Sequence, residues 1–245
     1  MWFSSLALNL FAKPNNKDCL LNMSGRLIIT PYNAEQELGQ PIVKINELRT
    51  GFNLVPTNTL SILRRQDEQI TQDDAFWSFT PSWMKQLDEA PYILRSDKLA
   101  SSSMYQESFK KQRCLLMVTG YYVWVTLTQG KHPFAIRRQH NRPFLLAGLW
   151  TRFPVAPGRA YDSFGLISIE ADPWLARLTP RVPLKLTPED ALKWLNPKTC
   201  EKKLLQLITK QDDELEAYPV SNLVNDPANN SMQVTSPIAN RILRR

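Results

Sequence analysis

The residue types that most often carry catalysis are sparse in this chain. Its 245 residues include two histidines, His132 and His140, and three cysteines, Cys19, Cys114 and Cys200. Their spacings match no zinc site, serine-hydrolase elbow or phosphate-binding loop, and the odd, scattered cysteines predict no disulfide framework. We therefore expect no metal and no cofactor. A cysteine hydrolase built from Cys114 and His132 is disfavoured, because a cysteine within a strand is usually inert packing.

Charge is the stronger chemical signal. The net charge is +7 and the pI is ≈ 9.4, which favours a polyanionic partner. The first residues, MWFSSLALNLF, are apolar, but they are too few to span a bilayer and lack the charged start of a secretory signal. We expect an extension outside the fold over 1–22, one domain over 23–238, a basic tail over 239–245 and no membrane association.

The elements that must position any site are centred on the most strand-like run, RCLLMVTGYYVWVTL at 113–127. Valine, tyrosine, tryptophan and threonine dominate it, which suits a half-buried pleated surface. Gly120 divides the run into two strands, and Gly130 closes a hairpin into a strand at 133–138. Helices are predicted to begin at Asp172, Thr187 and Cys200. Other strands are predicted at 27–30, 60–64, 143–150, 163–171 and 232–238.

Eight short segments carry a family resemblance when they are taken in order. They are MSGRL at 23–27, FNLVPT at 52–57, FWSFTPSW at 76–83, ILRSD at 93–97, GYYVW at 120–124, AGLW at 147–150, TPRVP at 179–183 and YPVS at 218–221. The ordered set resembles the SRAP family, whose members process abasic sites in single-stranded DNA. The resemblance covers about 23–238 and implies a single α+β domain of bent, barrel-like antiparallel sheets flanked by short helices.

The resemblance also identifies four chemical positions. In the family, removal of the first methionine exposes a cysteine whose amine and thiol close a thiazolidine on the aldehyde of the abasic sugar. An asparagine positions the sugar, and a glutamate and a histidine move protons. Here these positions hold Ser24, Ile93, Val123 and Thr179. None of these side chains titrates near neutral pH, and a serine hydroxyl is a far weaker acid than a thiol. The resemblance therefore implies a pseudoenzyme with no catalytic residue intact.

The family's DNA-contacting positions are largely retained. Arginines and aromatic side chains together form the stacking and electrostatic groove typical of single-strand binding. The resemblance implies that DNA is bound by Arg26, Trp83, Arg95, Arg113, Trp124 and Arg181. We expect a monomeric DNA-damage-response accessory protein, cytoplasmic and nucleoid-associated when bound to DNA, with an active SRAP paralogue or a repair protein as partner.

Three alternatives stay open. The chain could be a protein-interaction module without a nucleic-acid role, docking through 1–22. If Met23 is the first residue, the amine of Ser24 could form a weak, reversible Schiff base with an abasic aldehyde. The retained arginines could also be remnants that only pack and pair, as Arg95 would with Asp97.

Overall fold

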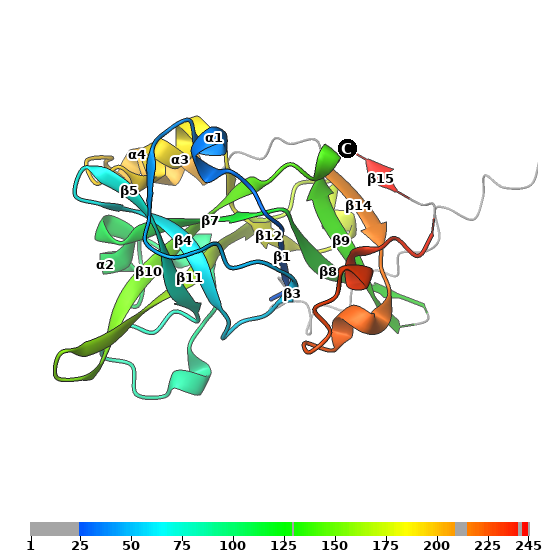
Figure 1. The fold of residues 1–245 in the computed structure, drawn as a ribbon, viewed down its shortest axis with the longest axis horizontal. Coiled ribbons are helices and arrows are strands. Elements are labelled where there is room, and N and C mark those ends of the chain that lie inside the picture. The colour runs from blue at the N-terminus through cyan, green and yellow to red at the C-terminus, as the bar shows by residue number, and fades with distance from the viewer. Residues whose placement is uncertain (1–24, 129, 209–214, 240–241, 245) are drawn as a thin grey trace, which may run out of the picture.

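The computed structural model describes residues 25–128, 130–208, 215–239 and 242–244. The predicted extension over 1–22, Ser24 and part of the predicted basic tail lie outside these ranges. Within them the chain forms a six-stranded and a nine-stranded sheet, with short helices around them (Figure 1). None of the helices in these ranges is long and hydrophobic enough to span a bilayer.

Five strands of the larger sheet close into a barrel. They are β4 (Thr59–Gln66), β5 (Gln69–Trp77), β7 (Arg113–Val118), β10 (Phe144–Ala156) and β11 (Arg159–Glu170). The order β5-β4-β7-β10-β11 is antiparallel throughout. A parallel pairing of β5 with β11 completes the ring, over only Phe76–Ser163 and Trp77–Phe164. The Trp77 and Phe164 rings stack across this seam. The α+β fold with barrel-like sheets is confirmed.

Short strands extend the barrel at its edges. They are β2 (Ile42–Lys44), β6 (Ile93–Arg95), β12 (Arg181–Pro183) and β13 (Lys185–Leu186). β6 and β12 pair with β11, and β13 pairs with β10. β2 pairs in parallel with β5 at Ile70–Gln72, on the edge that β11 occupies from Phe76 onward. One edge of β5 thus changes partner along its length.

The smaller sheet packs beside the barrel, and its strand order is β15-β14-β9-β8-β1-β3. Its strands are β1 (Leu27–Ile29), β3 (Gly51–Leu54), β8 (Gly120–Leu127), β9 (Gly130–Arg138), β14 (Leu215–Pro219) and β15 (Leu243–Arg244). The predicted division at Gly120 is confirmed, because β7 joins the barrel and β8 joins this sheet. A Cβ on Gly120 would lie 3.0 Å from the Ile136 carbonyl oxygen, so the two backbones approach closely here. The predicted hairpin of β8 with β9 is also confirmed.

The helices are short and lie at the surface. They are α1 (Ala34–Leu38), α2 (Gln106–Lys111), α3 (Pro188–Leu195), α4 (Glu201–Leu207) and six 3-10 turns, η1 (Leu87–Glu89), η2 (Ser96–Lys98), η3 (Gln139–Asn141), η4 (Leu175–Arg177), η5 (Asn222–Asn225) and η6 (Met232–Thr235). α1, α3 and α4 lie together near one end of the barrel, and the β10–β11 hairpin projects from the barrel (Figure 1). α3 begins as predicted, with Thr187 Oγ1 accepting the Asp190 N–H at 3.2 Å.

The strand predicted at 232–238 is wrong. This stretch begins with the 3-10 turn η6. Its β-pairing among the described residues is one isolated bridge, between Pro237 and Val220. The Thr235 hydroxyl donates to the Met232 carbonyl at 2.8 Å, and the Ser231 hydroxyl to the Asn229 side chain at 2.9 Å. Such local side-chain hydrogen bonds compete with ladder formation, and a pattern of apolar residues does not reveal them.

Candidate nucleic-acid interface

The start of β1 lies beside the neighbours of Ile93 and Val123, two of the four chemical positions. A Cβ on Gly25 would lie 2.7 Å from Pro56 and 2.8 Å from the Tyr92 ring, so only glycine fits without displacement. Tyr92 directly precedes Ile93 at the start of β6. The next carbonyl, of Arg26, accepts the N–H of Tyr122, the neighbour of Val123, at 3.1 Å. The fold therefore brings the beginnings of β1, β6 and β8 together.

Of the four positions that the resemblance identifies as chemical, three lie in the described residues, and none of the three holds an acidic or basic side chain. Val123 is 1 % exposed and packs in the main hydrophobic core. Ile93 is half-buried against the same core. Thr179 is buried, and its hydroxyl donates to the Arg181 carbonyl at 3.1 Å. Ser24 lies outside the described residues. A valine, an isoleucine and a bonded threonine can neither transfer a proton at neutral pH nor stabilise a developing charge as an ion.

A charged cluster lies at the end of β11, where β6 and β12 pair with its two edges; we call Arg95, Asp97 and Arg181 the phosphate cluster. Arg95 Nε and Nη2 donate to the two oxygens of Asp97 at 3.1 and 3.0 Å. Arg181 Nη2 lies 3.8 Å from the same carboxylate and donates to the Ser168 carbonyl at 2.7 Å. The side chains of Arg95 and Asp97 are 45 % and 48 % exposed, whereas that of Arg181 is 15 % exposed. One exposed carboxylate therefore lies between two guanidinium groups.

The electrostatics of the phosphate cluster follow from these contacts. The hydrogen bond from Arg95 lowers the pKa of Asp97, so the carboxylate is ionised at neutral pH. Burial lowers the pKa of Arg181, and the nearby charge of Arg95 lowers it further. Two like charges held this close favour an anion between them, and Asp97 provides one.

A second cluster joins the smaller sheet to the segment 222–230. Arg26 Nη1 donates to the Asn53 side chain and to the Val224 carbonyl, both at 2.9 Å. Asn53 Nδ2 in turn donates to the carbonyls of Val224, Asp226 and Asn229, at 2.9–3.1 Å. Burial is the main cause that lowers the pKa of Arg26. Arg26 thus fastens the C-terminal segment to β1 and β3.

Trp124 lies over this second cluster. Its indole N–H donates to Asn225 Oδ1 at 2.8 Å, and the Arg26 guanidinium lies 5.9 Å from its ring centroid. Trp83, in the loop after β5, is 59 % exposed. A large exposed indole on a loop is a ready stacking surface for a base. Trp83 and Trp124 are thus presented differently: Trp83 is largely exposed on a loop, and Trp124 is fixed by a hydrogen bond.

Arg113, another predicted DNA contact, is buried and hydrogen-bonded within the fold. It is 5 % exposed, and its donors are bound to the backbone carbonyls of Trp194, Phe109, Lys110 and Asn196, at 2.5–2.8 Å. Burial lowers the pKa of Arg113 to about 10, so it remains charged at neutral pH. Its guanidinium ties α2 and α3 to the barrel, and we leave it out of the interface.

Cys114 and His132, the pair that a cysteine hydrolase would need, lie in different sheets. Cys114 is fully buried on β7, and burial raises the pKa of its thiol. His132 lies on β9, in the other sheet. A buried thiol of raised pKa is a poor nucleophile. Within the described ranges no three His, Cys, Asp or Glu side chains gather as a metal site would require.

The comparisons with known proteins agree with this architecture. The family model of the SOS response associated peptidase, abbreviated SRAP, matches residues 23–227, which is most of the chain. The chain belongs to the SRAP family. It is similar to the abasic site processing protein YoqW of Bacillus subtilis (26 % identity, 84 % of this chain and 92 % of YoqW). It is also similar to the abasic site processing protein YedK of Escherichia coli (25 % identity, 76 % of this chain and 84 % of YedK).

Solved structures show the same fold. A protein from Bacteroides thetaiotaomicron superposes with a TM-score of 0.69 at 21 % identity, over 78 % of this chain and 87 % of that one. A protein from Bordetella bronchiseptica superposes with a TM-score of 0.68 at 17 % identity, over 80 % and 99 % of the two chains. The fold that the resemblance predicted is thus present in this chain.

Two features of this SRAP protein escaped the sequence reasoning. Asp97 was considered only as a partner of Arg95, whereas it faces Arg181 as well. Asn53 and Asn230 were not identified as anchors, although Asn230 Oδ1 accepts the N–H groups of Phe52 and Asn53 at 2.6 and 2.8 Å. The pair Asn229–Asn230, in a turn-rich segment, was the available signal for such a bond.

Proposed function

We propose that this SRAP protein binds single-stranded DNA without forming the covalent link that its family forms with abasic sites. The observation that carries the proposal is the state of Val123, which stands at the family's glutamate position and is 1 % exposed within the core. An aliphatic side chain packed there leaves no space for a carboxylate without repacking. The position is therefore adapted to stability, and the protein is a pseudoenzyme.

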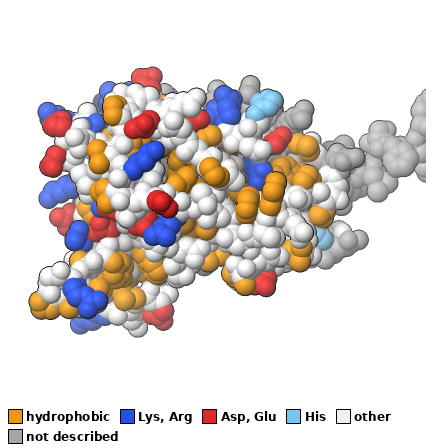
Figure 2. Space-filling view, viewed as in Figure 1, with side chains coloured by type: hydrophobic (Ala, Val, Ile, Leu, Met, Phe, Trp, Pro, Cys, Tyr) orange, Lys and Arg blue, Asp and Glu red, His pale blue; other side chains and the backbone are white. Residues whose placement is uncertain are grey.

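Binding to DNA is supported by the phosphate cluster and by Trp83. Arg95 is half-exposed and planar, which suits bidentate contact with a phosphate, and Arg181 lies on the other side of the same carboxylate. On the face seen in Figure 2, basic and acidic side chains alternate without forming one continuous basic surface. We therefore assign binding to this local cluster and not to the overall charge of +7. The relatives' names as abasic site processing proteins support DNA as the polymer.

The biological role that fits such a protein is that of an accessory factor. It would cover or mark single strands at a damaged site, beside an active SRAP paralogue or a repair protein. The predicted monomeric state and cytoplasmic location belong to the same proposal.

The chemistry is tested with a chain that starts at Met23, so that Ser24 is the terminal residue after removal of methionine. We expect no band that survives a denaturing gel after incubation with an oligonucleotide containing one abasic site. Borohydride is added in a parallel reaction, because it would trap a Schiff base formed by the Ser24 amine. A stable band without borohydride would contradict the loss of covalent chemistry.

Binding is tested by fluorescence anisotropy with a labelled oligothymidine. Affinity should fall linearly on logarithmic axes as salt rises, because phosphate contacts release counterions. Arg95→Ala and Arg181→Ala should each weaken binding several-fold for every sequence alike. Arg152→Ala is the matched control, since Arg152 is 65 % exposed and lies outside the phosphate cluster. Equal effects of all three variants would leave the cluster without a specific role.

A further inference from the structure

A cavity of ≈ 920 Å³ opens beside the barrel seam, at the point where the edge of β5 changes partner. β2 pairs with β5 as far as Gln72, and β11 pairs with it from Phe76. Asp73–Ala75 lie between these two pairings and line the cavity with residues of β4, β10, β11 and the loop that follows β5. Its size is within the range of ligand sites in proteins. The change of strand partner therefore creates a preformed binding space.

One wall of the cavity is aromatic and aliphatic. Phe76 meets Tyr161 edge to face with 5.9 Å between ring centroids, and Tyr161 contacts Phe153 at 5.4 Å. Leu87, on η1, also lines the cavity and is 44 % exposed. Rings that support one another offer apolar area at little entropic cost.

The rest of the lining is polar, and among its charged groups carboxylates outnumber guanidinium groups. The charged side chains that line the cavity are the carboxylates of Asp73, Asp74, Asp88 and Asp162 and the guanidinium groups of Arg64 and Arg152. Arg64 is 2 % exposed, pairs with both Asp73 and Asp162, and lies 4.4 Å from the Trp150 ring centroid. The Arg64 guanidinium is therefore buried and already paired with these two carboxylates. Arg152 Nη1 lies 3.5 Å from Asp162 Oδ1, and Arg49 pairs with Asp74 from outside the lining. The four carboxylates therefore outnumber their three arginine partners by one, and Asp88 is the carboxylate that is left for a cationic ligand.

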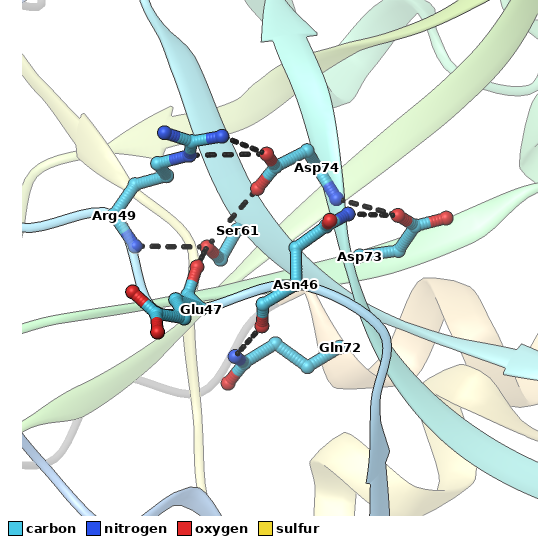
Figure 3. Close-up of polar contacts among 7 residues, drawn as sticks. All are labelled: Asn46, Glu47, Arg49, Ser61, Gln72, Asp73 and Asp74. Atoms are coloured by element: carbon cyan, nitrogen blue, oxygen red, sulfur yellow. Dashed lines mark hydrogen bonds and ion pairs between the residues drawn. The ribbon is translucent and has the colours of Figure 1, made fainter.

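The carboxylates are held in place before any ligand arrives. Figure 3 shows the loop before β3 bonded to β5: Asn46 Nδ2 donates to Asp73 Oδ1 at 2.9 Å, and Arg49 donates twice to Asp74 Oδ2, at 2.7 and 3.0 Å. Arg49 N also donates to Ser61 Oγ at 3.0 Å. Each aspartate still has acceptor positions beyond these bonds. Asp88 is exposed and forms no ion pair among the described residues. Fixed carboxylates bind a cation with little reorganisation.

We propose that this cavity binds a basic peptide segment of a partner protein. An arginine or lysine side chain of that segment would enter beside Asp73, Asp88 and Asp162. An apolar neighbour would pack against Tyr161 and Leu87. The carboxylates repel phosphate, so the cavity is distinct from the phosphate cluster and does not depend on the proposed DNA binding.

The test uses the full chain and a fluorescein-labelled hexapeptide of alternating arginine and leucine, followed by anisotropy. The same peptide with glutamate in place of arginine should not bind. Asp88→Lys should weaken binding roughly fivefold or more, because it replaces an attractive charge by a repulsive one. Glu89→Lys is the matched control: it makes the same change of charge one residue away, on the same η1 turn, and Glu89 does not line the cavity. We expect it to keep wild-type affinity.

Four results would overturn the proposal. They are no saturable binding of the arginine peptide, equal weakening by the two lysine variants, displacement of the peptide by oligothymidine, and a self-associated chain that Asp88→Lys dissociates. The last would identify a second copy as the occupant. Thermal melting of both variants shows that each is folded, so a loss confined to Asp88→Lys reports on the cavity.

Discussion

Replacing Asp97 by asparagine should increase the affinity for single-stranded DNA. Asp97 occupies the position between Arg95 and Arg181 that a phosphate would take, with contacts of 3.0–3.8 Å to the two arginines. A phosphate must displace this carboxylate or bind beside it against electrostatic repulsion. Asparagine keeps the size of the side chain and removes its charge, so both obstacles become smaller.

The magnitude follows from the exposure of the pair. Arg95 and Asp97 are each nearly half exposed, and exposed ion pairs shift an equilibrium by at most about fivefold. Removal of the repulsion between Asp97 and a bound phosphate adds a similar factor, also screened by salt. We therefore expect a gain of roughly five- to tenfold at low salt, smaller as salt rises.

The assay is anisotropy of labelled oligothymidine at several salt concentrations. Glu107→Gln is the matched control, because it removes one exposed carboxylate, 78 % exposed, from α2. The double variant Arg95→Ala/Asp97→Asn should gain little over Arg95→Ala. If Asp97→Asn and Glu107→Gln behave alike, the gain comes from net charge, and the reasoning about the phosphate cluster is refuted.

Three further predictions concern stability and reactivity. Arg113→Ala should lower the free energy of unfolding by about 3–4 kcal/mol, measured by urea denaturation, because it leaves several buried carbonyls without donors; a loss below about 1 kcal/mol would contradict this. Thr57→Gly should raise the free energy of unfolding by about 1 kcal/mol, since Thr57 has a φ of 76° and a β-branched residue is strained there. An unchanged midpoint would show that the strain is absent. In the chain starting at Met23, iodoacetamide should modify the exposed Cys200 and not the buried Cys114. Because burial raises the pKa of Cys114, moving from about pH 7 to about pH 9 should not produce its thiolate, and labelling should require denaturant.

Local patterns in the sequence were sufficient for the central elements. The division at Gly120, the hairpin of β8 with β9 and the Thr187 cap each depend on residues close together in the chain, which is where propensity and turn chemistry are informative. The strand predicted at 232–238 failed because side-chain hydrogen bonds decided the backbone there.

The sequence could name candidate positions for the site, but it could not give the contacts between them. Arg95 and Arg181 were identified through the family resemblance, and their common neighbour Asp97 follows only from the pairing of β6 and β12 on either side of β11. Arg113 is also an arginine, but it is buried and not exposed, because the C-terminal carbonyls of α2 and α3 surround its guanidinium. The cavity was invisible in the sequence, since it arises from a partner change on β5.

The barrel seam has a consequence for the order of folding. Two residue pairs join β5 to β11, and they come from segments distant in the sequence. Closing the barrel therefore costs chain entropy and forms few contacts in return. The hairpins β4–β5 and β10–β11 are local and can form earlier. Ring closure is therefore expected as a late event, and amide hydrogens at the seam should exchange with solvent sooner than those inside either hairpin.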